Sequence, residues 1–399
     1  MKSVVDVYLG GGPRLVGRAR FSMRRGQVST TFVYDDAYLA WSGAFAIDPA
    51  LPLVRSVGYT AGLPGAFADA APDRWGRRLI RRGAAHSLDE VDYLLGVDDH
   101  TREGALRFKE PDVPAFCAEG ARVPPVVQLP RLLSACRTVL TEEDAAEEVK
   151  CLLEAGSSTL GGARPKATVV DGDVLYVAKF PAPSDGHSVM AWEKTSLDLA
   201  CACGLKTPDS RLVRIGEEPV LLVRRFDRMG EGRVPYLSAM SLLGAHDGEG
   251  RDYVEIGEAL ATFVHDPSRD LRELFTRMVF SVAVNNVDDH LRNHGFVRRE
   301  DRWELSPLFD VNPNPEVAAK RATAIYGETG AGQARALCEA APFFGLRAEG
   351  ARLAVGNVLK VTAGWRAVAR RNGCPESEQR RFGAVFERRA QELRDAFGL

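Results

Sequence analysis

The chain has 399 residues, of which 45% are hydrophobic and 27% are charged, and its formal net charge is -2. This composition is typical of a globular protein with two or three domains, and the balanced charge excludes a bulk basic surface for nucleic acid. No apolar run approaches about 18 residues, so we expect no membrane contact, and the first residues lack the apolar core of a signal peptide. The cysteines have no metal-site spacing, which favours the reducing cytoplasm as the location.

The first 110 residues are predicted to form a small module rich in β-structure. Alternating apolar residues predict strands at residues 4–9, 15–21, 28–34 and 104–108, and a short helix is predicted at 88–95. Pro72 suits the first turn of another helix, and Asp73 would lie near the positive end of that helix. The arginines that follow Asp73 are expected on a solvated or interface face. Residues 109–126, rich in Pro, Ala and Glu, mark a connector.

A second module is predicted for residues 125–235. It begins with two helical patterns and continues with a hairpin, whose turn Asp171-Gly172-Asp173 is a strong hairpin signal. The helices are predicted at residues 128–140 and 142–154, and the strands at 167–170 and 174–180. Before the hairpin lies a Gly- and Ser-rich segment, residues 155–166, in which glycine would let backbone N–H groups approach a phosphate. Its spacing is not that of a Walker A loop.

Lys179 ends the second strand of this hairpin. Two interpretations stay open: an edge lysine whose stem covers apolar surface, or the lysine that grips the nucleotide phosphates in kinases. The next helix is predicted at residues 187–204, with Cys201 and Cys203 in its apolar pattern and therefore in the core. Glu193, near the start of that helix, is either a surface glutamate or an ion-pair partner of Lys179.

Two further strands, at residues 211–214 and 219–223, lead into the segment Arg224-Arg-Phe226-Asp227-Arg228. This segment would be the link between two lobes. In a kinase, backbone groups and apolar side chains at this place bind adenine.

A dense polar cluster at the end of the apolar run 280–296 carries the strongest chemical signal. Asp288 and Asn293 have the Asp-x-x-x-x-Asn spacing of a protein-kinase catalytic loop. In such a loop the aspartate orients the substrate hydroxyl group, and the asparagine side-chain oxygen binds magnesium. Asp310 ends an apolar segment further along the chain and is placed to be a second metal-binding carboxylate.

Residues 236–399 are predicted to be mostly α-helical. Helical patterns occur at residues 237–244, 252–264, 270–286, 333–340, 348–371 and 376–397. A loop rich in Pro and Asn, residues 312–316, follows Asp310. A β-rich part followed by an α-rich part, with the nucleotide-binding groups at their junction, indicates a two-lobed kinase.

Five ordered motifs allow a comparison with a known family. They are Thr159-Leu-Gly161-Gly162-Ala163-Arg-Pro-Lys166, Tyr176-Val-Ala-Lys179-Phe-Pro, Arg225-Phe226-Asp227-Arg228, Asp288-Asp-His290-Leu-Arg-Asn293 and Leu305-Ser-Pro-Leu-Phe-Asp310. With them the chain resembles the HipA family of bacterial serine/threonine kinases, the toxins of HipBA-type toxin–antitoxin modules. The resemblance implies an α+β fold, a two-lobed HipA-like protein-kinase fold. Its N-terminal lobe would carry an added β subdomain, and its C-terminal lobe would be all-α.

The resemblance also implies ATP and Mg2+ as cofactors. Asp288 would be the catalytic aspartate, Lys179 would bind the phosphates, and Asn293 and Asp310 would hold magnesium. The implied ATP site comprises Thr159, Gly161, Gly162, Ala163, Lys166, Lys179, Arg224, Phe226, Asp227, His290, Asn293 and Asp310. Arg224 stands where a well-known member of the family has an acidic residue at the start of the hinge.

The family's autophosphorylated serine falls on Thr159, with Ser157 and Ser158 adjacent, and the sequence leaves open which of the three accepts phosphate. Members of the family phosphorylate aminoacyl-tRNA synthetases, which arrests growth and gives persistence. A HipB-like helix-turn-helix antitoxin is the implied partner, and DNA would be contacted only indirectly through it.

Three alternatives remain open. The chain could be a small-molecule phosphotransferase of kinase-like fold, or a weakly catalytic co-repressor that acts with a DNA-binding antitoxin. His290 and His294 could form a metal site with Asp288, although hydrogen bonds within the loop are the favoured interpretation.

Overall fold

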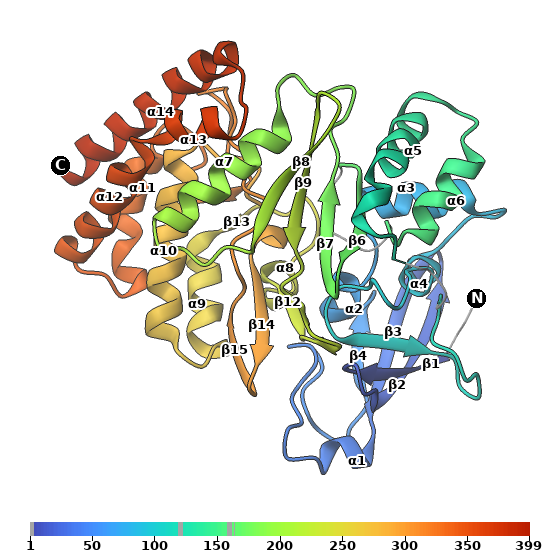
Figure 1. The fold of residues 1–399 in the computed structure, drawn as a ribbon. Helices are drawn as coiled ribbons and strands as arrows, with labels where there is room; N and C mark the ends of the chain where they lie inside the picture. Colours follow the sequence, from blue (N-terminus) through green and yellow to red (C-terminus); the bar gives the residue numbers. More distant parts are fainter. Residues whose placement is uncertain (1–3, 119–122, 158–161, 163) are drawn as a thin grey trace. The chain divides into compact units, whose positions relative to one another are not determined.

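The computed structural model describes residues 4–118, 123–157, 162 and 164–399 of the chain (Figure 1). It consists of two compact units. Unit 1 comprises Met1–Ser184, Ile215–Gly244 and Val297–Asp301, and unit 2 comprises Asp185–Arg214, Ala245–Phe296 and Arg302–Leu399. These units differ from the ranges 1–110, 125–235 and 236–399 predicted from the sequence. The main reason is that helix α7 (Val189–Ala202), predicted for the second module, packs against C-terminal helices in unit 2.

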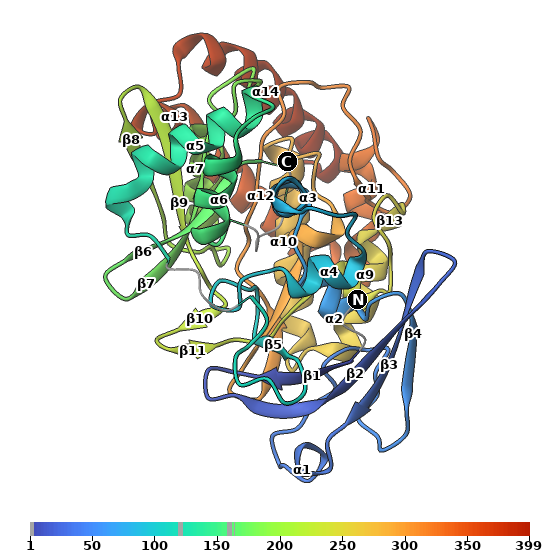
Figure 2. The same cartoon turned by 90° about the vertical axis from the view of Figure 1, so that its right-hand side faces the viewer.

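Unit 1 begins with an antiparallel sheet of five strands in the order β4-β3-β2-β1-β5. The strands are β1 (Val4–Leu9), β2 (Arg14–Arg24), β3 (Gln27–Tyr34), β4 (Gly58–Ala61) and β5 (Leu106–Lys109). Figure 2 shows β1 to β4 side by side. Val5 pairs with Ala19 and Ala19 pairs with Phe32, so these apolar side chains share one face of the sheet, where they are buried. The strands predicted in this region are confirmed.

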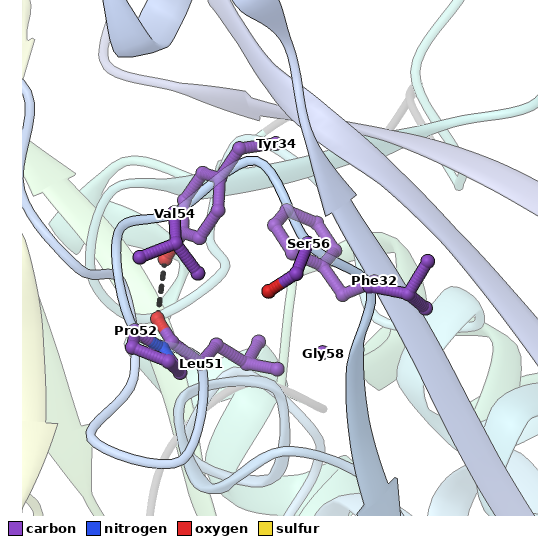
Figure 3. A pocket seen from close by; sticks show the side chains of 8 residues that line it. Phe32, Tyr34, Leu51, Pro52, Val54, Ser56 and Gly58 are labelled. Carbon is purple, nitrogen blue, oxygen red and sulfur yellow. Dashed lines mark hydrogen bonds between the residues drawn. The ribbon is translucent and has the colours of Figure 1, made fainter.

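A small pocket lies between this sheet and the loop after β3 (Figure 3). Phe32, Leu51 and Gly58 line it, and the Tyr34 hydroxyl donates a hydrogen bond to the Leu51 carbonyl oxygen over 2.8 Å. The cavity volume is about 40 Å³, well below the roughly 300 Å³ at which ligand pockets begin. The pocket is therefore a detail of packing and not a candidate substrate site.

Helices of unit 1 lie within residues 36–154 of the chain. They are α1 (Asp36–Leu39), α2 (Gly65–Asp69), α3 (Arg74–Gly83), α4 (Glu90–Leu95), α5 (Leu129–Thr141), which follows the 3-10 turn η1 (Val126–Gln128), and α6 (Ala146–Glu154). Asp73 is the N-cap of α3, because its carboxylate accepts from the Gly76 backbone N–H over 2.7 Å. Pro72 precedes the cap, so its predicted place in the first helical turn is wrong, whereas Asp73 lies at the positive end as expected.

The arginines of α3 lie on an interface. Arg82 donates to the backbone carbonyl oxygens of Val139, Glu142 and Glu143 over 2.6, 2.6 and 2.7 Å, and Arg78 donates to that of Val139 over 3.1 Å. These carbonyl groups belong to the C-terminal end of α5 and the residues after it, where a cation is favoured. Of the two predicted environments for this arginine series, the interface applies to these two side chains.

A second group of strands in unit 1 carries the Gly-rich segment. β6 (Lys166–Asp171), β7 (Val174–Lys179) and β9 (Glu218–Arg224) are neighbouring antiparallel strands, which confirms the predicted hairpin. After β9 come β10 (Arg228–Met229), β11 (Gly232–Arg233), β12 (Tyr236–Ser238) and α8 (Ala239–Leu242). The helix predicted at 237–244 starts later because Asp69 accepts from both the backbone N–H and the hydroxyl of Ser238, each over 2.7 Å. Ser238 therefore ends a strand and caps α8.

Unit 2 is mostly helical. Besides α7 it contains α9 (Tyr253–Phe263), α10 (Pro267–Ala283), α11 (Gln333–Ala340), α12 (Ala348–Thr362), α13 (Trp365–Arg371) and α14 (Glu376–Phe397), with the 3-10 turns η2 (Leu291–Asn293) and η3 (Ala341–Phe344). The short strands β13 (Arg251–Asp252), β15 (Arg302–Leu305) and β16 (Thr323–Ala324) accompany them. β8 (Ser210–Ile215) and β14 (Gly295–Arg299) each have residues in both units. The expectation of an all-α C-terminal part did not include β13 to β16. No helix in the described part of the chain combines the length and the apolar sequence needed to span a bilayer.

An aromatic cluster forms the part of the core of unit 2 that lies between α7, α13 and α14. Trp192 is fully buried and stacks on Phe382, with ring centroids 4.0 Å apart. Trp365 packs against Phe386 with centroids 5.1 Å apart. The helix predicted at 348–371 is broken into α12 and α13 at residues 363–364, and Trp365 then lies in this cluster. Cys203, the C-cap of α7, is buried as expected, but Cys201, within α7, is exposed.

Replacing Phe382 by alanine tests the role of this cluster. The variant Phe382→Ala should lower the free energy of unfolding by about 3–5 kcal/mol, because it leaves a cavity against Trp192. Leu353, a 76% exposed residue of α12, provides the control, and Leu353→Ala should change the free energy by no more than about 0.5 kcal/mol. Urea unfolding followed by tryptophan fluorescence measures both, and equal effects would contradict the assignment.

Candidate functional site

The residues predicted to form the site are divided between the two units. Unit 1 contains Ser157, Gly162, Lys166, Lys179, Arg224, Phe226 and Asp227, and unit 2 contains Glu193, Asp288, His290, Asn293 and Asp310. Ser158, Thr159, Gly161 and Ala163 lie outside the described residues. Each group is considered within its own unit.

The loop that follows α10 exposes Asp288 between buried neighbours. Val287 and Asp289 are 6% and 4% exposed, whereas Asp288 is exposed to solvent. The loop begins at Asn285, which has a left-handed backbone with φ 51°. Arg389 donates to the Asn285 side-chain oxygen over 3.0 Å, and the amide group of Asn285 donates to the Asn314 carbonyl oxygen over 2.7 Å. Asparagine tolerates this conformation better than most residues, and these contacts hold it there.

Asp289 anchors the same loop from inside unit 2. Its carboxylate accepts hydrogen bonds from the Tyr253 hydroxyl and, over 2.9 Å, from the Ser281 hydroxyl. His294 Nε2 lies 3.1 Å from one carboxylate oxygen, and an Arg321 nitrogen lies 3.7 Å from the other. Burial alone would raise the pKa of Asp289, but His294 and Arg321 outweigh burial and hold this pKa well below its usual range. The Asp289 side chain is therefore a structural anchor that turns its neighbour Asp288 outward.

Asn293 is oriented by the backbone of the loop. Its side-chain amide group donates to the Asp288 carbonyl oxygen over 3.0 Å, and the side chain is 5% exposed. Since the nitrogen is used in this bond, the side-chain oxygen Oδ1 is the atom that can bind a cation. The predicted pair Asp288 and Asn293 is thus joined in one hydrogen-bonded loop.

Asp310 lies in a second loop, which is tied to the first. Its backbone is left-handed, with φ 56°, a strained conformation for a residue other than glycine. The Asn312 amide group donates to the Asp310 carboxylate over 3.1 Å, and the Asn312 backbone N–H donates to the Asn286 side chain over 3.3 Å. The Asn314 N–H donates to the Asn285 carbonyl oxygen over 3.0 Å. The two loops that carry Asp288, Asn293 and Asp310 therefore form one connected segment of unit 2.

The histidines of this loop have separate environments. The His294 ring contacts Asp289 and packs edge-on against Tyr253, with centroids 5.2 Å apart. His290 is half-buried. Among the residues that the structure describes, no group of three or more His, Cys, Asp or Glu side chains is arranged to hold a metal ion.

In unit 1, Lys179 lies directly opposite Lys166 in the β6–β7 pair. Side chains at directly opposite positions share one face of a sheet, so the two lysine side chains are neighbours. Lys166 is 2% exposed, and its ammonium group lies 2.7 Å from a carboxylate oxygen of Asp73. Lys179 is half-buried. The Asp73 contact was not foreseen from the sequence, since the two residues are far apart along the chain.

Glu193 and Ser157 are both buried. Glu193 is 1% exposed, so the interpretation as a surface glutamate is wrong. Its predicted partner Lys179 belongs to the other unit, and this pairing stays a prediction. Ser157 is also 1% exposed, so its hydroxyl group is poorly accessible to a phosphate donor.

The segment after β9 is held by a buried network of charges. Asp227 contacts Arg225 and Arg228 over 2.5 and 2.7 Å and accepts from the Gly104 backbone N–H over 2.8 Å. Burial alone would raise the pKa of Asp227, but the two arginines outweigh it and hold this pKa well below its usual range. Phe226, beside this network, packs against Tyr236 with centroids 6.1 Å apart. Asp227 therefore fixes the backbone around Phe226, a role that its spacing in the sequence did not reveal.

Glu103 lies beside this network and gives a test of it. Burial, reinforced by the charge of Asp227, raises the pKa of Glu103 from 4.5 to about 8. The folded chain thus favours the neutral form of Glu103. The contribution of this form to the free energy of unfolding is fully present below pH 4.5 and is lost as the pH rises through about 8. The variant Glu103→Gln should remove this loss. Thermal unfolding of both proteins between about pH 5 and 9 measures it, and parallel curves would refute a neutral Glu103 in the folded chain.

Asp288 and Asp289 form a natural pair of variants. Asp289→Asn should lower the free energy of unfolding by about 3–5 kcal/mol, because it removes the charge that the buried His294 and Arg321 face. Asp288→Asn should change it by no more than about 0.5 kcal/mol, because Asp288 is exposed. Denaturant titrations of both variants decide this, and the reverse order of the two losses would contradict the anchor role of Asp289.

Comparison of the sequence with family models and with known proteins shows which proteins the chain is similar to. A family model described as the HipA-like C-terminal domain matches residues 158–365, and a model of the HipA N-terminal domain matches residues 5–109. A protein of Haemophilus influenzae named "Putative kinase" is 23% identical over 161 residues, which cover 36% of this chain and 47% of that protein. "Putative kinase Y4dM" of Sinorhizobium fredii is 29% identical over 146 residues, or 32% of this chain and 35% of that protein. The matches thus span less than half the length of either relative.

Solved structures are similar as well. A chain of the Shewanella oneidensis MR-1 toxin–antitoxin complex of HipA, HipB and operator DNA has a TM-score of 0.75 and 15% identity. The similarity covers 99% of this chain and 98% of that one. The Helicobacter pylori proinflammatory kinase CtkA is similar over 60% of this chain and 92% of its own, with a TM-score of 0.48 and 13% identity. The first likeness confirms the predicted fold class, a two-lobed α+β fold of HipA type.

Proposed function

The chain belongs to the HipA family, and from this premise we propose that it is an ATP-dependent serine/threonine protein kinase. One observation carries the proposal: the Asn293 amide group donates to the backbone of Asp288, while the Asp288 side chain is exposed between buried neighbours. One short loop thereby carries a carboxylate that can orient a hydroxyl group and an amide oxygen that can hold a cation. Both residues have the spacing of a kinase catalytic loop.

The oxygen donors near this loop suit magnesium. Mg2+ prefers oxygen ligands and is usually bound by one or two protein groups together with phosphate oxygens and water. Oδ1 of Asn293 and the carboxylate of Asp310 are oxygen donors on two loops that hydrogen bonds join. When bound, magnesium would neutralise charge on the phosphates of ATP.

The remaining roles follow from chemistry and position. Asp288 would accept a hydrogen bond from the attacking serine or threonine hydroxyl and orient that group. Lys179 would bind phosphate oxygens, and Phe226 with its neighbours would contact adenine. Phosphoryl transfer requires positioning and neutralisation of charge more than covalent help from the protein. The proposal draws on residues of both units, with Lys179 and Phe226 in unit 1 and the other groups in unit 2.

Regulation by autophosphorylation belongs to the same proposal. Thr159 or Ser158 would be the acceptor, and the burial of Ser157 makes that residue the weakest of the three candidates. A phosphate group adds a charge of about -1.5 to -2 next to the segment that would face ATP. Such a charge would flip the segment out of the ATP site and switch the kinase off.

The partners are proposed from the family. The chain would act as the toxin of a toxin–antitoxin module. Its partner would be a HipB-like helix-turn-helix antitoxin, and the chain would contact DNA only indirectly through this antitoxin. A protein substrate of the aminoacyl-tRNA synthetase class would be phosphorylated, and growth would stop. The similar Shewanella oneidensis complex, which contains HipA, HipB and operator DNA, supports the antitoxin and the indirect contact with DNA.

Two substitutions test the catalytic assignment. Asp288→Asn and Asp310→Asn should each reduce phosphate transfer from ATP by at least about 100-fold, since each removes a charge needed for positioning. Asparagine also tolerates the left-handed backbone of Asp310, so this variant should keep its fold. Transfer is measured with labelled ATP and magnesium, and chelation of the metal should abolish it in the wild-type chain.

Asp301→Asn serves as the matched control, because Asp301 is an exposed carboxylate in the β14–β15 turn. It should retain wild-type transfer. Full activity in both Asp288→Asn and Asp310→Asn would rule out the assignment, and transfer to a small molecule but to no protein would favour the small-molecule phosphotransferase.

A further inference from the structure

The Gly-rich segment, residues 155–166, is held at its described ends by the N-terminal region of unit 1. Gly156 has φ 64°, and a Cβ atom added to it would lie 2.4 Å from a side-chain carbon of Thr101, so its backbone packs directly on Thr101. At the other end, the Trp75 indole N–H donates to the Lys166 carbonyl oxygen over 3.1 Å. Trp75 is 1% exposed, so this bond is made in the interior of unit 1.

Asp73 makes the second contact with Lys166. One oxygen of its carboxylate accepts from the Gly76 N–H over 2.7 Å, and the other lies 2.7 Å from the Lys166 ammonium group. The bond with Gly76 orients the carboxylate at the start of α3. In this orientation the second carboxylate oxygen faces the Lys166 ammonium group. The side chains of Asp73 and Lys166 are 8% and 3% exposed, so this ion pair is shielded from water and from salt.

The ammonium group of Lys166 also lies against the Gly-rich segment. A Cβ atom added to Gly162 would be 2.9 Å from Lys166 Nζ. If Asp73 lost its charge, the buried ammonium group would lose this ion pair, and a change in its position would follow. Gly162 borders the space around it, so movement of Lys166 would disturb the Gly-rich segment.

The same pair affects Lys179. Lys166 and Lys179 are directly opposite each other in the β6–β7 pair, and like charges at such positions repel. The carboxylate of Asp73 compensates the charge of Lys166 at this place. The neighbour that Lys179 faces across the strand pair is therefore part of an ion pair.

We infer that Asp73 is a positioning residue of the kinase site: through its buried ion pair with Lys166, the N-terminal region sets the Gly-rich segment and the surroundings of Lys179. This inference rests on the proposed function for its effect on ATP. Asp73 would touch neither ATP nor substrate and would act through Lys166 alone. The N-terminal region would thereby affect catalysis, because Asp73 belongs to this region.

Three variants test the inference. Asp73→Asn keeps a side chain that caps α3 well but removes the charge. The double variant Asp73→Asn with Lys166→Met removes both charges and leaves no buried ion unpaired. Arg82→Met, on the same helix, removes the contacts with α5 and leaves Lys166 untouched. It is the matched control for general damage to α3.

Hydrogen exchange of the backbone amides in peptides covering residues 150–170, measured without nucleotide, gives the first readout. Exchange should rise about tenfold or more in Asp73→Asn, return towards the wild-type rate in the double variant and stay unchanged in Arg82→Met. The KM for ATP should rise about tenfold in Asp73→Asn and recover in Asp73→Glu, which restores the charge. A loss of overall stability alone would raise exchange in peptides throughout the chain and would leave the KM for ATP unchanged, whereas the inference predicts a rise confined to this segment.

Unchanged exchange and unchanged KM in a folded Asp73→Asn protein would overturn the inference, as would equal changes in Arg82→Met. If Asp73→Asn does not fold, the double variant decides, since it should fold and show exchange close to that of the wild type. A wild-type chain that transfers no phosphate would refute the proposed function, and the exchange measurements would still decide whether Asp73 positions this segment.

Discussion

The buried carboxylate of Asp289 is the constraint on which the candidate site depends. An ion in the interior of a protein is stable only when charges and hydrogen bonds surround it, and Tyr253, Ser281, His294 and Arg321 provide them. This requirement fixes the loop after α10. Because Asp289 points inward, the adjacent Asp288 is exposed, and Asn293 closes the loop onto the Asp288 backbone. The chemistry proposed for the exposed aspartate is therefore a consequence of the burial of its neighbour.

A similar principle applies in unit 1, where the charged groups most relevant to the proposed site are paired inside the protein. Asp73 pairs with Lys166, and Asp227 pairs with Arg225 and Arg228. The pair of Asp73 and Lys166 joins two segments that are distant in the sequence. Asp227 also accepts from the backbone N–H of Gly104, which belongs to the N-terminal region. The region matched by the HipA N-terminal model therefore supports both the Gly-rich segment and the segment that contains Phe226.

The sequence predicted the local structure of most elements and the residue types of the site. The β6–β7 hairpin, α14 and the strands of the first sheet followed from turn residues and apolar periodicity. Long-range contacts could not be predicted in this way. Periodicity predicted one helix at 348–371, but the structure has two, with a break at residues 363–364 before the buried Trp365. Periodicity also predicted a helix at 237–244, but Ser238, which donates to Asp69, ends a strand. The resemblance to the HipA family identified Lys166 and Asp227 as candidates, and Glu193 was identified by its place near the start of a helix, but only the fold shows that each is buried.

Mass spectrometry of the wild-type chain, after incubation with ATP and magnesium, tests the central claim most directly. The peptide to examine covers residues 150–180. We expect one added phosphate group on Thr159 or Ser158, together with loss of further activity as the modification accumulates. A chain that binds ATP but leaves this peptide and every added protein unmodified would contradict the claim that it is a serine/threonine kinase.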